Sequence, residues 1–303
     1  MDTTQAMLRA RAQKTLIPAF NIPYLPMLEA VAQAIRDEDA VAMIQVARLE
    51  WEKFASKSLE AVTDEYAKFA DTRHTMLHLD HVPAIDEDHQ NVDYIPIVMR
   101  AIQAGYQSVM IDGSRLPLDQ NIEASAKVAK LAHAAGVAVE AELGAVAGHE
   151  AGGIGMDYEE LFASKKGFTD LGEAKLFAEK SGCDWLSVAA GSVHGAIADG
   201  LRKQKKPAAR LDIAHIAALS EATGGMPLVL HGGSGIRREY ILDAMKNGVA
   251  KINVATEIRQ PYENALEERP GDTVYANDQV YDRTRWVIRE FLGISGNASK
   301  LFE

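Results

Sequence analysis

Eight short apolar segments, each followed by a stretch of helical periodicity, restrict how this chain can fold more than any other feature. The segments are rich in Val, Ile and Leu and lie at residues 17–22, 41–46, 75–79, 107–111, 137–143, 184–189, 227–231 and 250–254. Apolar strands of this length are typical of parallel sheets covered on both faces. The stretches between them carry apolar residues at i, i+3, i+4 and i+7, as at Leu28, Val31, Ala32 and Ile35, which is one face of an α-helix.

Eight consecutive β/α units predict a closed (β/α)8 TIM barrel, because eight is the number of such units that closes one. Four expected helices end in a glycine just before the next strand, at Gly105, Gly136, Gly182 and Gly248. The rival is an open doubly wound sheet, which predicts a G-x-G-x-x-G turn after an early strand. The first 100 residues contain no such turn. We expect one barrel domain over residues 1–303, with a long mobile loop at about 144–168 and C-terminal helices.

Composition excludes several classes of function. Asp and Glu number 43 against 32 Lys and Arg, giving a net charge of −11, which disfavours nucleic acid and anionic membranes as partners. The polar first residues do not resemble a signal peptide, and no apolar run is long enough to span a bilayer. The single cysteine, Cys183, cannot form an intrachain disulfide. We expect a cytoplasmic protein.

The polar residues of the strands fall where a barrel enzyme keeps its chemistry, at the strands' C-terminal ends. Six consecutive strands end in, or lead to, side chains of metal-ligand or acid/base type, namely Asp80, His81, Asp112, Glu140, Glu142, His194, His231 and Asn253. Neutral imidazoles with an open fourth position are how catalytic zinc is held. A divalent metal therefore explains His81, His194 and His231 better than a purely structural cluster does.

Two neighbouring turns form a predicted anion site. His231–Gly235 leads directly from the seventh strand into a helix, and Asn253–Thr256 does the same after the eighth. Glycines let backbone N–H groups approach an anion, and helix N-termini add partial positive charge. The alternative is an ordinary turn in which Ser234 and Thr256 cap helices. Beside a metal ligand, on loops where barrels commonly bind phosphate, the phosphate interpretation is favoured.

A metal next to a phosphate site, with spare carboxylates, suits enolisation of a phosphorylated ketone. The metal polarises the carbonyl and stabilises the enediolate, and a carboxylate removes the proton. Addition of that enediolate to an aldehyde uses every part of the predicted site.

Eight motifs resemble those of the class II, metal-dependent fructose- and tagatose-bisphosphate aldolases. They occur in the family's order from about Leu16 to about Ala298, and are AFNI from Ala19, LHLDH from Leu77, MIDGS from Met110, EAELG from Glu140, TD at Thr169, GSVHG from Gly191, LHGGSG from Leu230 and KINVATE from Lys251. The resemblance implies a zinc-dependent aldolase that reversibly cleaves a ketose 1-phosphate or 1,6-bisphosphate to dihydroxyacetone phosphate and an aldehyde.

The resemblance also implies a role for particular residues. Zinc would be held by His81, His194 and His231, with Asp112 and Glu142 marking a second, more buried metal position. Asp80 would handle the proton on the acceptor's C4 oxygen, and Glu150 would remove the C3 proton of dihydroxyacetone phosphate. Substrate would contact Asn21, Gly195, Gly232, Gly233, Ser234, Asn253, Ala255 and Thr256. Family members also bind a monovalent cation, Na⁺ or K⁺, near those glycines and form homodimers or homotetramers.

The chain departs from the family pattern mainly at the ends of the first three strands. Pro23 and Tyr24 stand where the family usually has His-Asn, Ala47 where it has Ser, and Val82 where it has Gly or Cys. These departures predict a retained donor half-reaction with an altered acceptor aldehyde. Arginines that could bind a distal phosphate are Arg283, Arg285 and Arg289.

Two other functions remain as alternatives. One is a non-catalytic subunit that binds sugar phosphate or supports a partner aldolase, although such a subunit has no need of both an acid and a base. The other is a different metal-dependent barrel, such as a hydrolase or an epimerase, which leaves the paired phosphate loops without a purpose.

Overall fold

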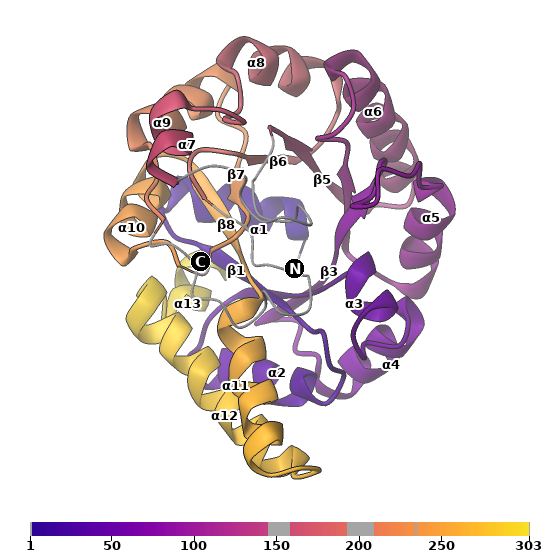
Figure 1. Cartoon of the computed structure of the whole chain (residues 1–303), viewed down its shortest axis with the longest axis vertical. Coiled ribbons are helices and arrows are strands. Elements are labelled where there is room, and N and C mark those ends of the chain that lie inside the picture. Colours follow the sequence, from indigo (N-terminus) through magenta and orange to yellow (C-terminus); the bar gives the residue numbers. More distant parts are fainter. Residues whose placement is uncertain (1, 145–157, 193–208, 234, 303) are drawn as a thin grey trace.

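The computed structural model describes residues 2–144, 158–192, 209–233 and 235–302. Its strands form a closed parallel barrel in chain order, with β1 pairing with both β2 and β8 (Figure 1). This confirms the predicted (β/α)8 TIM barrel. The strands are β1 (Ile17–Asn21), β2 (Ala42–Ala47), β3 (Thr75–Pro83), β4 (Ser108–Asp112), β5 (Ala138–Leu143), β6 (Trp185–Val188), β7 (Leu228–Leu230) and β8 (Val249–Val254).

Helices surround this barrel, and most of them follow the predicted alternation. The helices that follow a strand and reach the next one are α2 (Met27–Asp37), α4 (Leu59–Phe69), α5 (Tyr94–Ala104), α6 (Leu118–Ala134), α8 (Leu171–Lys180), α9 (Ile213–Ala222) and α10 (Arg238–Lys246). Each of the four predicted helix-ending glycines has a positive φ, between 71° and 111°. Glycine adopts this conformation without the strain that a Cβ brings.

Further helices precede, interrupt or follow the alternation. They are α1 (Thr3–Ala12), α3 (Arg48–Glu52), α7 (Tyr158–Ser164), α11 (Thr256–Glu268), α12 (Thr273–Trp286), the π-helical η1 (Val287–Leu292) and α13 (Asn297–Phe302). The loop predicted at about 144–168 therefore contains helix α7, and residues 145–157 of it lie outside the described part of the chain.

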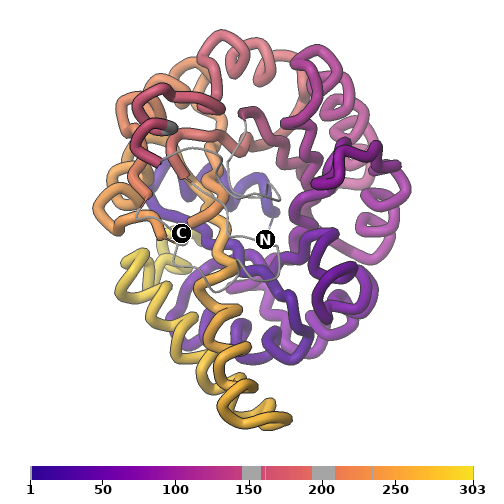
Figure 2. Tube along the Cα trace, viewed as in Figure 1, coloured from indigo at the N-terminus to yellow at the C-terminus, as the bar shows by residue number. Residues whose placement is uncertain are grey.

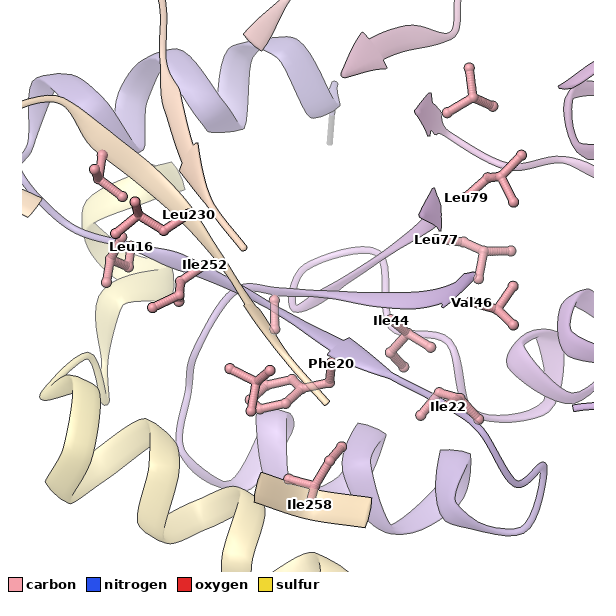
Figure 3. Packing of buried hydrophobic residues seen from close by; sticks show 14 of the residues in the cluster. Leu16, Phe20, Ile22, Ile44, Val46, Leu77, Leu79, Leu230, Ile252 and Ile258 are labelled. Atoms are coloured by element: carbon pink, nitrogen blue, oxygen red, sulfur yellow. The ribbon is translucent and has the colours of Figure 1, made fainter. Parts of the chain in front are cut away.

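Buried apolar side chains form two separate clusters. The larger one lies between the strands and the surrounding helices, and Figure 3 shows Phe20 of β1 and Ile258 of α11 among its members. The smaller one fills the barrel where the strands begin, and it includes Met7 of α1, Met43 of β2 and Leu301 of α13. Apolar side chains thus close the barrel at the N-terminal ends of its strands. The polar side chains inside the barrel lie toward the C-terminal ends of the strands.

Helices α11 and α12 pack against each other and extend beyond the ring of helices (Figure 2). The C-terminal segment is tied to the barrel through Glu38, which is buried and accepts hydrogen bonds from Arg285, Arg289 and Ser295. Glu38 directly follows α2, at the end of the barrel where β2 begins. Arg285 and Arg289 are therefore structural and lie away from the predicted site.

No helix in the described ranges combines the length and the apolar character needed to cross a bilayer.

Candidate metal centre

A local irregularity in β3 brings two consecutive side chains to the same site. Neighbouring side chains of a regular strand point to opposite faces. Between β3 and β4 the pairing shifts from Leu79 opposite Val109 to Val82 opposite Ile111, so β3 has one extra residue here. His81 adopts a φ of 31°, rare for a residue with a Cβ. This bulge allows the consecutive residues Asp80 and His81 both to face the barrel interior, where a regular strand would direct only one of them.

Three side-chain amides hold the Asp80 carboxylate. Asn21 Nδ2 and Gln45 Nε2 donate to Asp80 Oδ2 at 3.0 and 3.2 Å, and Asn253 Nδ2 donates to Oδ1 at 2.9 Å. Burial alone would raise the pKa of Asp80, but the positive charges of His81 and Lys251 lower it to about 2. Asp80 is therefore an ionised carboxylate that is held in a fixed orientation.

His231 lies between two glutamates of β5. Its Nε2 is 2.8 Å from Glu140 Oε1, and its Nδ1 is 3.1 Å from Glu142 Oε2. All three side chains are buried. A carboxylate on one ring nitrogen fixes the tautomer of a metal-binding histidine and directs the other nitrogen toward the metal. Glu140 is placed to do this for His231.

Two overlapping groups of ligand atoms could hold metal ions. Asp80, His81 and His231 form one group, and His81, Asp112 and Glu142 form the other, with the ligand atoms of each within 4.8 Å of one another. The rings of His81 and His231 are 4.4 Å apart, centroid to centroid. The site brings together all of the predicted metal-binding residues that the structure describes.

The chemistry of these residues fits a divalent cation. Glu142 Oε2 is buried, and the partner it meets is His231 Nδ1 at 3.1 Å, in a geometry that makes no regular hydrogen bond; such a position is costly for a carboxylate unless a cation or solvent compensates it. Burial, reinforced by the charge of Asp112, raises the pKa of Glu142. Burial lowers the pKa of His81, but Asp80 and Asp112 outweigh it and raise that pKa to about 10. Without a metal, the imidazole must carry the positive charge that these carboxylates require.

The two predicted phosphate loops lie side by side. The backbone N–H of Gly233 donates to the Asn253 carbonyl at 3.2 Å, and a Cβ on Gly233 would come within 2.7 Å of that oxygen. Helix α11 begins at Thr256 after Ala255, so its first N–H groups have no partner within the helix. Gly232, with φ 71°, makes the turn out of β7. The N–H of Gly233 is already engaged, which leaves the start of α11 as the better anion site.

Four predicted site residues, Glu150, His194, Gly195 and Ser234, lie outside the described residues. Their roles stay predictions. Of the arginines proposed for a distal phosphate, Arg283 alone contacts the first turn of α11, where it pairs with Glu257.

Besides Gln45, which binds Asp80, the structure adds three residues that sequence reasoning had not assigned to the site. Glu50 of α3 accepts from the Ala47 N–H at 2.7 Å and from Asn21 Nδ2 at 3.3 Å. Burial, with a smaller contribution from Asp80, raises the pKa of Glu50 to about 8. Lys251 and Trp185 both bind Glu140. A lysine inside the apolar strand β8 was the one available signal, because lysine is rarely buried unless paired.

A depression of about 530 Å³ lies far from this site, where α1, α9 and α10 end. It is lined by Arg11, Lys14 and Lys246, with Glu221 nearby. Basic side chains at helix C-termini stabilise the exposed carbonyl groups, which accounts for this cluster without a ligand.

Barrel topology, a buried carboxylate–histidine cluster at the strand ends and two adjoining phosphate-type loops define a metal-dependent barrel enzyme. Comparison with known proteins gives the family. Residues 1–298 match the class II fructose-bisphosphate aldolase family, and the chain belongs to that family. It is an aldolase of the lyase class, and the family depends on metal.

Individual relatives agree with this assignment. A fructose-bisphosphate aldolase of Streptococcus pyogenes serotype M1 is 32% identical over 308 aligned positions, covering 96% of each chain. Among solved structures, the YdjI aldolase of Escherichia coli K12 superposes with a TM-score of 0.77 at 25% identity, over 98% of each chain. A putative fructose-1,6-bisphosphate aldolase of Coccidioides immitis has the same fold, with a TM-score of 0.76 at 24% identity over 98% of each chain.

Proposed function

We propose that this aldolase is zinc-dependent and reversibly cleaves a ketose 1-phosphate or 1,6-bisphosphate to dihydroxyacetone phosphate and an aldehyde. The observation that carries the proposal is the ionised, amide-held Asp80 beside the His81–His231 pair, next to two adjoining phosphate-type loops. An acid/base group, a metal position and an anion site are the three parts that this cleavage needs.

His81, His231 and the predicted ligand His194 would hold the metal, with Asp112 and Glu142 available at the second position. Histidine nitrogens and carboxylate oxygens are the ligand types that zinc accepts in open catalytic sites. When bound, the cation would act as a Lewis acid that polarises the substrate carbonyl and stabilises enediolate charge.

Asp80 takes the proton from the C4 hydroxyl during cleavage and returns it during condensation. The cationic surroundings hold the pKa of Asp80 below its usual value, so that it is ionised before the reaction, and Asn21, Gln45 and Asn253 fix its orientation. Asn253 begins the second phosphate loop and donates to this carboxylate, so it can orient the substrate between the two.

Glu150 is the proposed base for the C3 proton of dihydroxyacetone phosphate. The donor phosphate would bind Gly195, Gly232, Gly233, Ser234 and the Asn253–Thr256 turn, with Na⁺ or K⁺ nearby. These assignments rest on the family motifs. The first turn of α11 supports them, because helix N-termini attract phosphate.

The departure from the family pattern at Tyr24 supports a changed aldehyde. Tyr24 donates to Glu263 Oε1 at 2.7 Å, stacks on Tyr262 with centroids 5.1 Å apart, and meets Phe54 edge-on. Arg259, which also pairs with Glu263, lies over Phe54. Tyr24 is therefore part of a packed aromatic cluster at the end of β1. An acceptor screen that gave the best turnover with glyceraldehyde 3-phosphate would contradict the change in acceptor.

A non-catalytic subunit is not favoured, because the acid/base carboxylate and the described metal ligands are all present and assembled. We infer that the enzyme works as a homodimer or homotetramer in the cytoplasm on a small sugar phosphate, without nucleic-acid or membrane partners. The net charge of −11 supports the absence of nucleic-acid and anionic-membrane partners, and the single cysteine suits a reducing cytoplasm. The oligomeric state is proposed from the family resemblance alone.

The experiment that tests the proposal is exchange of the C3 proton of dihydroxyacetone phosphate in D₂O, followed by NMR with and without a chelator. It needs no knowledge of the aldehyde. Exchange should disappear on chelation and return when Zn²⁺ is added. If the protein held its metal and gave no exchange, the donor assignment would be wrong and the binding-subunit alternative would become the better one.

A further inference from the structure

Lys251 is a fully buried lysine inside the barrel that contacts a hydrogen-bond partner of the acid/base group and a carboxylate that binds His231. Its Nζ lies 2.6 Å from Asn253 Oδ1 and 2.9 Å from Glu140 Oε2. An ammonium group carries only donor hydrogens, so the atoms that contact it must be acceptors. Lys251 therefore determines which end of the Asn253 amide faces it, whereas either oxygen of the Glu140 carboxylate can accept from it.

For Asn253 this contact selects one of two possible amide orientations. With Oδ1 on Lys251, the Nδ2 group points toward Asp80 and donates to Asp80 Oδ1 at 2.9 Å. The flipped orientation would place the NH₂ group against the ammonium and the amide oxygen against the carboxylate. Both contacts would be repulsive and would leave buried groups unpaired. The ammonium thus ensures that Asp80 meets a donor.

The two carboxylate oxygens of Glu140 have different partners. Oε2 accepts from Lys251 and from Trp185 Nε1, the latter at 2.6 Å. Oε1 is left for His231 Nε2 at 2.8 Å. A single ammonium group therefore links the partner of Asp80 to the carboxylate that orients His231.

A metal ion is not needed at this depth of the barrel. His78, Asp80 and Glu140 also form a group of suitable ligand atoms, but Lys251 lies against Glu140 at ion-pair distance. The ammonium supplies the positive charge there, which confines the metal to the side of Asp80 that carries His81 and His231.

We propose that Lys251 is a positioning residue, which acts by holding the Asn253 amide in the orientation that donates to Asp80. The proposal deepens the proposed function, because it rests on Asp80 being the acid/base group. It predicts that the effect of Lys251 on turnover passes through Asn253.

A double-mutant cycle tests this directly. Lys251→Met, Asn253→Ala and the double variant are compared with wild type for kcat and KM in ketose-phosphate cleavage at saturating Zn²⁺. We expect Lys251→Met to lower kcat by about tenfold or more in the wild-type background and by less than about threefold in the Asn253→Ala background. Equal losses in both backgrounds would overturn the proposal, because a purely electrostatic or packing role does not require Asn253.

A second readout does not depend on activity. In protein labelled with ¹⁵N-asparagine, the Asn253 NH₂ signals are identified by their loss in Asn253→Ala. We expect them to move on Lys251→Met and to stay unchanged in Lys246→Met, an exposed lysine on α10. Unchanged signals in Lys251→Met would also refute the proposal. Turnover by wild type tests the proposed function, whereas these comparisons test Lys251.

Lys251→Met leaves Glu140 buried without its cation, and such variants can fail to fold. If urea unfolding shows this, the same cycle is run in a Glu140→Gln background, where neither side chain is charged. The ratio of kcat losses with and without the Asn253 side chain then decides the proposal in the same way.

Discussion

Substitution of Asp80 by Asn is the most informative change to the proposed acid/base group, since it keeps the shape and removes the charge. Asp80 Oδ2 accepts from two amides, and Oδ1 accepts from Asn253 alone. The carboxamide oxygen of the variant should therefore face Asn21 and Gln45, with its NH₂ group against Asn253 Nδ2. Lys251 prevents Asn253 from turning to relieve this contact.

The structure gives a magnitude for each consequence. One buried hydrogen bond is lost and two donors meet, which should lower the free energy of unfolding by about 1–3 kcal/mol. Loss of the acid/base group should lower kcat for cleavage by about 100- to 10,000-fold, about 3–5 kcal/mol in the activation barrier. Exchange of the C3 proton should persist, because Asp80 is not assigned to that proton.

The assay compares Asp80→Asn with wild type for ketose-phosphate cleavage and for C3 exchange in D₂O, at equal metal content. Asp119→Asn, which removes an exposed carboxylate from α6, is the matched control and should leave both rates unchanged. Cleavage within threefold of wild type would refute the role of Asp80. A parallel loss of exchange and cleavage would place Asp80 in metal binding instead.

Three further predictions follow from neighbouring contacts. Glu140→Gln should weaken zinc binding by about 10- to 100-fold, because Glu140 orients His231; chelator competition measures this, and unchanged affinity would contradict it. Gly233→Ala should raise KM for the phosphorylated substrate by about tenfold or more, because its Cβ would meet the Asn253 carbonyl; an unchanged KM would show that the two turns can separate. Burial raises the pKa of Glu38, but Ser295, Arg285 and Arg289 outweigh it and lower that pKa in the folded state. The stabilisation of the folded protein by Glu38 is therefore present above the pKa that Glu38 has in the unfolded chain. It is lost as pH falls through the lower pKa that Glu38 has in the folded protein. Urea unfolding of Glu38→Gln should show a deficit from wild type at pH 7 that narrows toward pH 3, and a deficit independent of pH would exclude this cause.

Strand positions could be predicted closely because parallel buried strands are continuous apolar runs. Seven of the eight agree with the structure to within one residue at each end, and β3 continues to Pro83 because of its bulge. Helix α1 was not predicted, since it buries only Thr3, Ala6, Met7 and Ala10 against the end of the barrel and otherwise reads as polar. Helix α7 was hidden within a stretch rich in glycine.

The residues at the strand ends could also be predicted, because all parallel strands of a barrel deliver their C-terminal ends to one rim. The hydrogen-bond partners of these residues could not be predicted from the sequence. Asn253 and Asp80 are 173 positions apart, and only barrel closure between β1 and β8 makes them neighbours. Glu50 contacts Asn21 from the short helix α3. That helix is not part of the strand pattern from which the site residues were predicted. The sequence therefore indicated the candidate groups, and the structure shows which contacts orient those that it describes.

The same buried charges explain why the metal position and the acid/base group are neighbours. Asp80, Asp112, Glu140 and Glu142 place four carboxylates near one another inside the barrel, and Lys251 compensates one of them. The remaining excess of negative charge is unfavourable in a low-dielectric interior unless cations balance it. In the metal-free protein, nearby carboxylates raise the pKa of His81 and His231 against the effect of burial. The positive charge that balances the carboxylates is then carried by these two histidines. A divalent cation would take over that role and leave the imidazoles neutral, as ligands must be. The charge excess that makes this interior costly is therefore what favours a cation there.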